Sequence, residues 1–192
     1  MQPRTREVLD FLDAQRATLE QAVAAVPPAM RDRKPTADRW SVAEVLEHLA
    51  LVEGRIMGML EAQLGAARAN GLGAERESAP VVPTIDVPGL LDRSRKLTAS
   101  EVSQPRGALS ADDAWSALAA RRAATRATVL AADGLALSEV KSSHPRIGTL
   151  DLYQWLVFLG GHEARHAAQV REIADAAAAG NGEPARAGGN GA

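Results

Sequence analysis

Apolar residues recur every three to four positions along four long segments of the chain, which is the spacing of helices that bury one face. Few runs alternate β-branched with polar residues, and no strand is expected beside the fourth segment. The sequence therefore predicts an all-α fold with long helices over residues 4–26, 41–69, 110–132 and 149–179. Amphipathic helices of this length bury their apolar faces together as a four-helix bundle.

Capping residues mark several of the expected helix boundaries. Ser41 is followed three residues later by Glu44, and this pair predicts a capping box at the start of the second helix. Ser110 is the expected N-cap of the third helix. Gly71 and Gly134 follow the last apolar positions of the second and third helices, where glycine commonly ends a helix.

The connection between the second and third long helices is long and irregular. Residues 71–89 contain several glycines and prolines, which predicts either a structured loop over one end of the bundle or a mobile flap. A short helix is expected over residues 90–101. The composition changes again near residue 180, so we expect one helical domain over residues 1–179 and a disordered tail over 180–192.

Composition narrows the classes of function. The formal net charge is −2 and charges of both signs are interspersed, so no nucleic-acid-binding surface is predicted. The chain has no cysteine, which leaves histidine and carboxylates as its metal ligands. No window approaches the ~18 apolar residues of a membrane span, and the N-terminus lacks an apolar signal core. We therefore expect a cytoplasmic protein that binds neither membranes nor nucleic acid.

The strongest chemical signal is a pair of histidines in the fourth helix. His162 and His166 are four residues apart, so their rings lie on one helical face and can reach the same metal ion. The same face carries the apolar residues of this helix, which directs both rings into the bundle. Buried imidazoles need partners. We interpret the pair as metal ligands, and a hydrogen-bonded structural pair is the alternative.

A metal site needs a third ligand, and the chain has two further histidines. His48 lies about two turns into the second helix, at the edge of its apolar stripe, from where it can reach a site between helices. His144 precedes Pro145 in the loop before the fourth helix, a place better suited to the mouth of a pocket or a helix cap. We expect His48 to be the third ligand, with His144 as the competing candidate.

The fourth helix also satisfies the H-E-x-x-H pattern of zinc peptidases, in which the glutamate is the general base. A peptidase of this kind needs a further ligand, commonly downstream, and a β-sheet whose edge strand holds the substrate. The extended H-x-x-G-x-x-H pattern is absent, and no strand is predicted beside the helix. We therefore reject the peptidase interpretation and keep the two histidines.

Two polar neighbours of the histidines are candidates for a catalytic role. Glu163 is a candidate general base, or an acceptor for a histidine N–H. Its other interpretation is an ion pair with Arg165 or with Arg121/Arg122 across the bundle. Gln169, one turn beyond the second histidine, is a candidate hydrogen-bond donor to a water molecule or ligand on the metal.

Three sequence blocks together resemble the DinB-like superfamily, from the first helix to about residue 177. The blocks are W-S-V-x-E-V-L-x-H-L from Trp40, H-P-x-I-G-x-L from His144, and W-L-x-F-L-x-x-H-E-x-R-H-x-x-Q from Trp155. The resemblance implies a four-helix bundle, often dimeric, with a three-histidine site for a divalent metal such as zinc or nickel. The matching positions are His48, His162 and His166. A homodimer is therefore expected.

The resemblance leaves three functional hypotheses. Some relatives are transferases or isomerases that use a low-molecular-weight thiol, and the first hypothesis is a metal-dependent transferase that activates such a thiol for attack on an electrophile. The second is a hydrolase that uses metal-bound hydroxide. The third is a non-catalytic metal-binding or stress-related protein. In the first two, a small molecule is the substrate.

Overall fold

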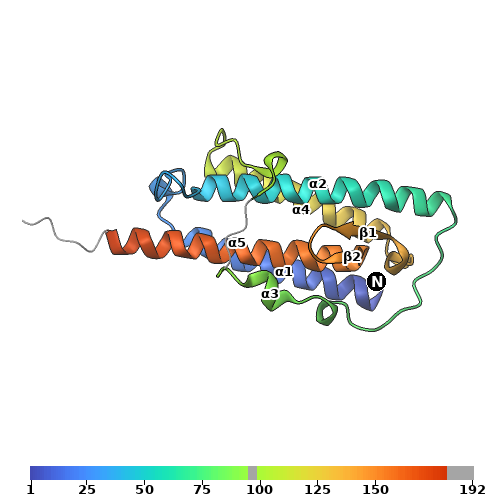
Figure 1. Ribbon diagram of the computed structural model, residues 1–192. Helices are drawn as coiled ribbons and strands as arrows, with labels where there is room; N and C mark the ends of the chain where they lie inside the picture. Colours follow the sequence, from blue (N-terminus) through green and yellow to red (C-terminus); the bar gives the residue numbers. More distant parts are fainter. Residues whose placement is uncertain (95–98, 181–192) are drawn as a thin grey trace, which may run out of the picture.

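The computed structural model describes residues 1–94 and 99–180, and its architecture is an all-α four-helix bundle (Figure 1). The long helices are α1 (Pro3–Ala24), α2 (Val42–Ala69), α4 (Ala111–Ala131) and α5 (Leu152–Gly180). A short helix, α3 (Val87–Leu91), and two short strands, β1 (Lys141–His144) and β2 (Gly148–Asp151), complete the regular elements apart from single 3₁₀ turns. The predicted fold class is confirmed, including the short helix between the second and third long helices.

The four long helices are arranged as two pairs. α1 packs mainly against α5, and α2 packs mainly against α4. In Figure 1, α1 and α5 run in one direction and α2 and α4 run in the opposite one, so the chain between α2 and α4 returns along the bundle. α2 and α5 are therefore antiparallel, which places the first turns of α2 beside the middle of α5.

The apolar core is divided into two clusters by a layer of charged residues. One cluster contains the first half of α1 and α5 and the second half of α2, with Leu12, Leu60 and Tyr153 among its fully buried side chains. The other cluster contains the opposite halves of these helices and the start of α4, including Leu46 and Leu118. On each long helix, the charged residue of the dividing layer lies between the two clusters: Arg16, Glu53, Arg122 and Glu163.

The capping residues form the expected structures. The backbone N–H of Glu44 donates to Ser41 Oγ at 3.1 Å, and the Glu44 carboxylate accepts from the Ser41 N–H at 2.9 Å. This capping box closes the start of α2 six residues before His48. Gly71 and Gly134 both have positive φ angles, of 81° and 90°, which glycine adopts without strain. They end α2 and α4 as predicted.

The expectation of no strand beside the fourth helix was wrong. β1 and β2 form an antiparallel hairpin directly before α5, so this helix starts at Leu152 rather than at residue 149. Two local features explain the later start. Gly148 has a φ of 93°, and the side chains of Asp151 and Gln154 each accept the other's backbone N–H. Asp151 is therefore the N-terminal cap that the sequence analysis did not identify.

The connection between α2 and α4 supports the structured-loop alternative over the flap. Ala74 forms a β-bridge with Leu135, and the backbone N–H groups of Val81 and Val82 both donate to the carboxylate of Glu7. These contacts hold the segment against the end of the bundle where α1 begins.

The predicted short helix is shorter and lies earlier than expected. The Asp86 side chain accepts from the N–H of Gly89 and begins α3, which ends at Leu91 rather than near residue 101. Residues 95–98 and the tail expected over 181–192 lie outside the described residues. None of the helices in the described part of the chain has the length and apolar character needed to cross a membrane.

Candidate metal centre

Three histidines from two helices meet inside the bundle. His48 comes from the second turn of α2, and His162 and His166 come from the middle of α5. One ring nitrogen from each lies within 4.8 Å of the other two. We call these three residues the histidine cluster, and they are the residues that the sequence analysis selected as metal ligands.

The spacing of the histidine cluster fits a divalent metal ion. The Nε2 atoms of His48 and His162 are 3.4 Å apart. Two nitrogen ligands with tetrahedral zinc bonds of about 2.0–2.1 Å would lie roughly 3.3–3.4 Å from each other. This pair therefore already has the separation that a shared ion needs, and a nitrogen of His166 lies within 4.8 Å of both.

Hydrogen bonds on the outer side of the cluster orient two of the rings. His48 Nδ1 lies 2.7 Å from the carbonyl oxygen of Ser103. A carbonyl oxygen can only accept, so Nδ1 of His48 carries the hydrogen and the Nε2 lone pair faces the cluster. His166 Nδ1 lies 2.9 Å from Gln169 Oε1, with the same consequence for its ring. Metal-binding histidines usually have an outer hydrogen bond of this kind.

The surroundings keep the three imidazoles neutral. Burial lowers the pKa of His48, places that of His162 well below its ordinary value and lowers that of His166 to about 3. The other histidines, as potential positive charges, lower the pKa values of His162 and His166 further. Neutral imidazole is the form that binds a metal ion. At neutral pH the cluster therefore offers three nitrogen donors without first losing protons.

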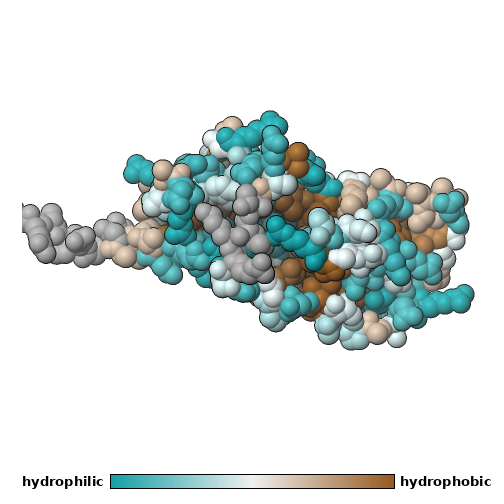
Figure 2. Space-filling model, viewed as in Figure 1, coloured by the Kyte–Doolittle hydropathy of each residue, from teal (hydrophilic) through white to brown (hydrophobic). Residues whose placement is uncertain are grey.

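A cavity of about 590 Å³ lies against the histidine cluster, and we call it the large cavity. His48 and His166 contribute to its wall, together with Gln169. The other lining residues come from the turn before α2, from the segment between α3 and α4, and from α5: Asp38, Arg39, Trp40, Arg93, Ala99, Gln104, Arg165 and Glu172. In Figure 2 the surface between α2 and α5 combines hydrophobic and hydrophilic residues. A volume of this size suits a small-molecule ligand.

Glu163 contacts arginines and not the rings of the histidine cluster, although it follows His162 directly in the chain. Its carboxylate oxygens lie 2.5 Å from Arg16 Nε and 2.5 Å from Arg122 Nη2. Arg122 also pairs with Glu53 at 2.9 Å. We call Arg16, Glu53, Arg122 and Glu163 the ion-pair network. Of the partners proposed from sequence, Arg122 is present, whereas Arg16 was not foreseen.

A comparison with protein families agrees with this geometry, because the model of the DinB superfamily matches residues 12–170. The chain belongs to the DinB superfamily. DinB proteins are a metal-associated family, and the histidine cluster lies within the matched region.

One curated relative of this DinB chain is the uncharacterized protein YuaE of Bacillus subtilis (strain 168). It is 27% identical over 145 residues, which cover 74% of this chain and 82% of YuaE. Its name assigns no activity. No solved structure matches the chain.

His144, the competing ligand candidate, lies on β1 outside the histidine cluster of this DinB protein. Its ring packs 4.6 Å from the Phe158 ring, and Phe158 in turn stacks at 6.0 Å on His162. His144 Nδ1 accepts the backbone N–H groups of Arg146 and Ile147, so it closes the hairpin turn. In the described part of the chain, the lining of the large cavity does not include His144.

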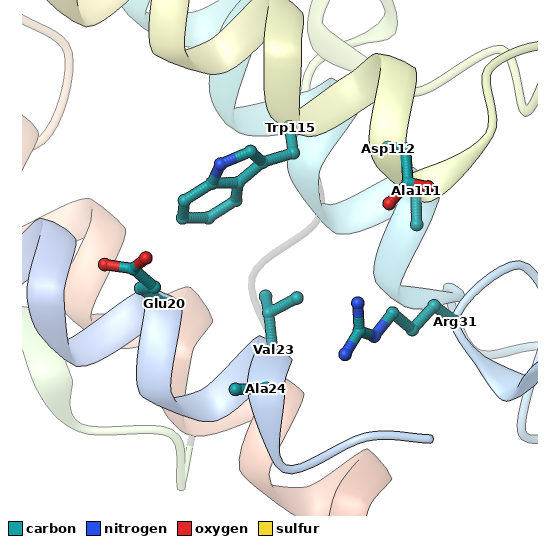
Figure 3. A pocket seen from close by; sticks show the side chains of 7 residues that line it. All are labelled: Glu20, Val23, Ala24, Arg31, Ala111, Asp112 and Trp115. Atoms are coloured by element: carbon teal, nitrogen blue, oxygen red, sulfur yellow. The ribbon is translucent and has the colours of Figure 1, made fainter. Parts of the chain in front are cut away.

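A smaller cavity of about 190 Å³ lies between α1 and α4 of the DinB bundle, away from the histidines. Figure 3 shows Trp115 of α4 and Val23 of α1 on opposite sides of it, with Arg31 at its edge. Its lining contains no histidine. The large cavity, by contrast, includes two residues of the histidine cluster in its lining.

Several residues of the DinB site were not identified from the sequence. Ser103 acts through its backbone carbonyl, which carries no side-chain signature. Arg93 falls within the short helix expected over residues 90–101, whereas the structure places it in irregular chain after α3. Arg39 and Trp40 had a usable signal, because they immediately precede the capping box of α2 and must therefore lie beside its first turns.

Proposed function

We propose that the histidine cluster binds a divalent metal ion, zinc or nickel, and that the protein is a transferase for a low-molecular-weight thiol. The observation that carries this proposal is the meeting of three neutral histidines beside a cavity of small-molecule size. A bound divalent ion is a Lewis acid and lowers the pKa of a thiol that reaches it.

Different residues would bind the ion, orient its ligands and make room for the substrates. His48, His162 and His166 would hold the ion, and Ser103 and Gln169 keep two of these rings turned toward it. The large cavity provides room for the thiol and its electrophilic partner. Because the chain has no cysteine, the thiol in this reaction comes from a separate molecule.

The contacts of Glu163 favour a thiol over water as the nucleophile. Both of its carboxylate oxygens are engaged by arginines, so the glutamate of the H-E-x-x-H stretch is not available to remove a proton from water. A free thiol has a pKa of about 8.5, against about 15.7 for bulk water, and a bound divalent ion would lower both values. The thiol starts from the lower pKa, so it would ionise at this site more completely than water and without a separate general base.

The test is an activity panel on the zinc- or nickel-loaded protein. Simple thiols are supplied with a chlorinated or epoxide electrophile and the thioether product is measured, while esters and amides are supplied in parallel. We expect the rate of thioether formation to fall at least about 100-fold in His48→Ala. Removal of a residue that only hydrogen-bonds to a metal ligand already lowers metal affinity or activity about 10–100-fold, and His48 would be a ligand itself. His144→Ala, which removes a histidine outside the cluster, is the matched control and should retain activity.

Other results would overturn the proposal. Turnover of esters or amides with no thioether product would identify a hydrolase. No turnover on either panel, combined with a large loss of thermal stability on metal removal, would identify a structural metal site. Thioether formation that is unchanged in His48→Ala would remove the histidine cluster from the reaction.

A further inference from the structure

Three arginines from separate parts of the chain line the large cavity. Arg39 precedes α2, Arg93 follows α3 and Arg165 belongs to α5. Arg39 and Arg93 both donate to the Glu172 carboxylate, so their guanidinium groups lie together at one anionic group. Arg165 lines the same cavity as His48 and His166.

The charges that line the large cavity do not cancel. Among the described residues of the lining, the acidic ones are Asp38 and Glu172, so three guanidinium groups face two carboxylates and one positive charge remains in excess. A divalent ion on the histidine cluster would add to this excess. A cavity with this charge attracts anions and repels cations.

The geometry of Glu172 shows which kind of anion the arginines accept. Arg93 donates to both oxygens of this carboxylate, at 2.8 and 3.0 Å, and Arg39 donates to one of them at 2.7 Å. The Arg93 contact is the two-pronged pairing that guanidinium groups make with carboxylates. The three side chains are 27% to 45% exposed, so a dissolved ligand can reach them.

One aromatic residue of the cavity lining contacts the histidines. The Trp40 ring lies 4.9 Å from the ring of His48 and stacks at 6.3 Å on that of His166. A ligand that fills the cavity beside the histidine cluster would therefore also meet an aromatic side chain. Arg165 is held at this wall by hydrogen bonds to the backbone carbonyls of Leu90 and Asp92.

We propose that the large cavity binds a small molecule carrying a carboxylate, which pairs with Arg39 and Arg93 in competition with Glu172. The other end of this ligand lies beside the histidine cluster. The role of this ligand as a co-substrate rests on the proposed function. The carboxylate pairing itself needs no metal and no turnover.

The test is calorimetric titration of the full-length protein with succinate, in metal-free and zinc-loaded form. Succinate should bind the metal-free protein, and Arg93→Gln should weaken binding at least about tenfold because the two-pronged contact is lost. Glu172→Gln should strengthen binding about threefold or more, since it removes the competing carboxylate. Arg126→Gln is the matched control, because Arg126 pairs with Asp13 on the exposed surface, and it should bind as wild type.

Inorganic phosphate is titrated as a second arm. Tighter binding of phosphate than of succinate would overturn the assignment to a carboxylate. No succinate binding, or equal weakening in Arg93→Gln and Arg126→Gln, would overturn the site itself.

The two proposals fail in distinguishable ways. If thioether forms no faster from mercaptosuccinate than from 2-mercaptoethanol, and succinate does not bind, the carboxylate site is overturned. Thiol transfer itself would then still stand. Succinate binding with the expected variant pattern, but no thioether product from any thiol, would support the carboxylate site and overturn the proposed function.

Discussion

The histidine cluster and the ion-pair network meet at consecutive positions of α5, His162 and Glu163, yet they satisfy their polar groups differently. The network contains two arginines and two glutamates, so each charge has an opposite charge within the chain. The cluster contains three groups of the same kind, all neutral. Within the cluster, His48 and His162 are joined by one long hydrogen bond of 3.4 Å between their Nε2 atoms, and no opposite charges hold the three rings together.

This difference separates a structural polar layer from a binding site. The ion-pair network joins α1, α2, α4 and α5 through the middle of the bundle, and each of its charges faces an opposite charge on another helix. The histidine cluster joins α2 and α5 and contains no carboxylate, so a cation placed among its nitrogens would meet lone pairs and no competing ion pair. Several buried neutral nitrogen ligands that converge on one point are the better indicator of a cation site.

The largest expected effect breaks the ion-pair network and leaves the histidine cluster intact. Arg122→Ala removes the arginine that pairs with both Glu53 and Glu163, so two buried carboxylates lose a counter-charge. The free energy of unfolding should fall by about 3–5 kcal/mol. Chemical denaturation of the metal-free protein measures this loss.

The control for this variant is Arg126→Ala, whose ion pair with Asp13 is exposed and should contribute less than about 1 kcal/mol. A loss in Arg122→Ala no larger than that of the control would show that the network is not a structural layer.

A smaller effect is expected when the pH of the metal-free protein is lowered. Burial lowers the pKa of His166 from 6.5 in the unfolded chain to about 3 in the folded one. The unfolded chain therefore binds the proton first, so this stability is complete above about pH 6.5 and is lost as the pH falls toward 3. Between pH 7.5 and pH 5 the contribution of His166 to the loss should be about 2 kcal/mol, and the other histidines with lowered pKa values, His48, His144 and His162, add to it.

The variant His166→Gln isolates this histidine from the carboxylates that titrate in the same range. Its free energy of unfolding, measured at pH 7.5 and pH 5, should fall less steeply than that of the wild type. Identical pH slopes in the two proteins would contradict the buried, neutral state of His166.

The smallest expected effect weakens the outer support of the histidine cluster. Gln169→Ala removes the acceptor for His166 Nδ1–H, so zinc affinity should fall about tenfold, while the free energy of unfolding of the metal-free protein changes little. A competition titration with a chromophoric chelator measures the affinity. Gln21→Ala, at an exposed position of α1, should bind zinc as wild type, and equal affinity in both variants would remove Gln169 from the site.

Much of the bundle and of the histidine cluster could be predicted because both depend on helical periodicity. The i, i+4 spacing placed His162 and His166 on the apolar face of α5. The capping box at Ser41 defined the start of α2 and therefore the helical turn in which His48 lies. The pairing of helices follows from neither feature. For this reason the contact between Glu163 and Arg16 of α1 was missed.

The rest of the site depends on irregular chain, where local patterns are weak. β1 and β2 have four residues each, too few for alternation to identify a strand. The Ser103 carbonyl and Arg93 are placed by the connection between α2 and α4, whose course over the bundle depends on tertiary contacts. The sequence thus indicated the residues of the histidine cluster more clearly than the groups that surround them.

The central claim is that one metal ion joins α2 to α5 through three histidines, and X-ray absorption of the zinc-loaded protein tests it most directly. The account predicts three imidazole nitrogens at about 2.0–2.1 Å from zinc in the wild type and two in His48→Ala. A zinc environment that is the same in both proteins would contradict it.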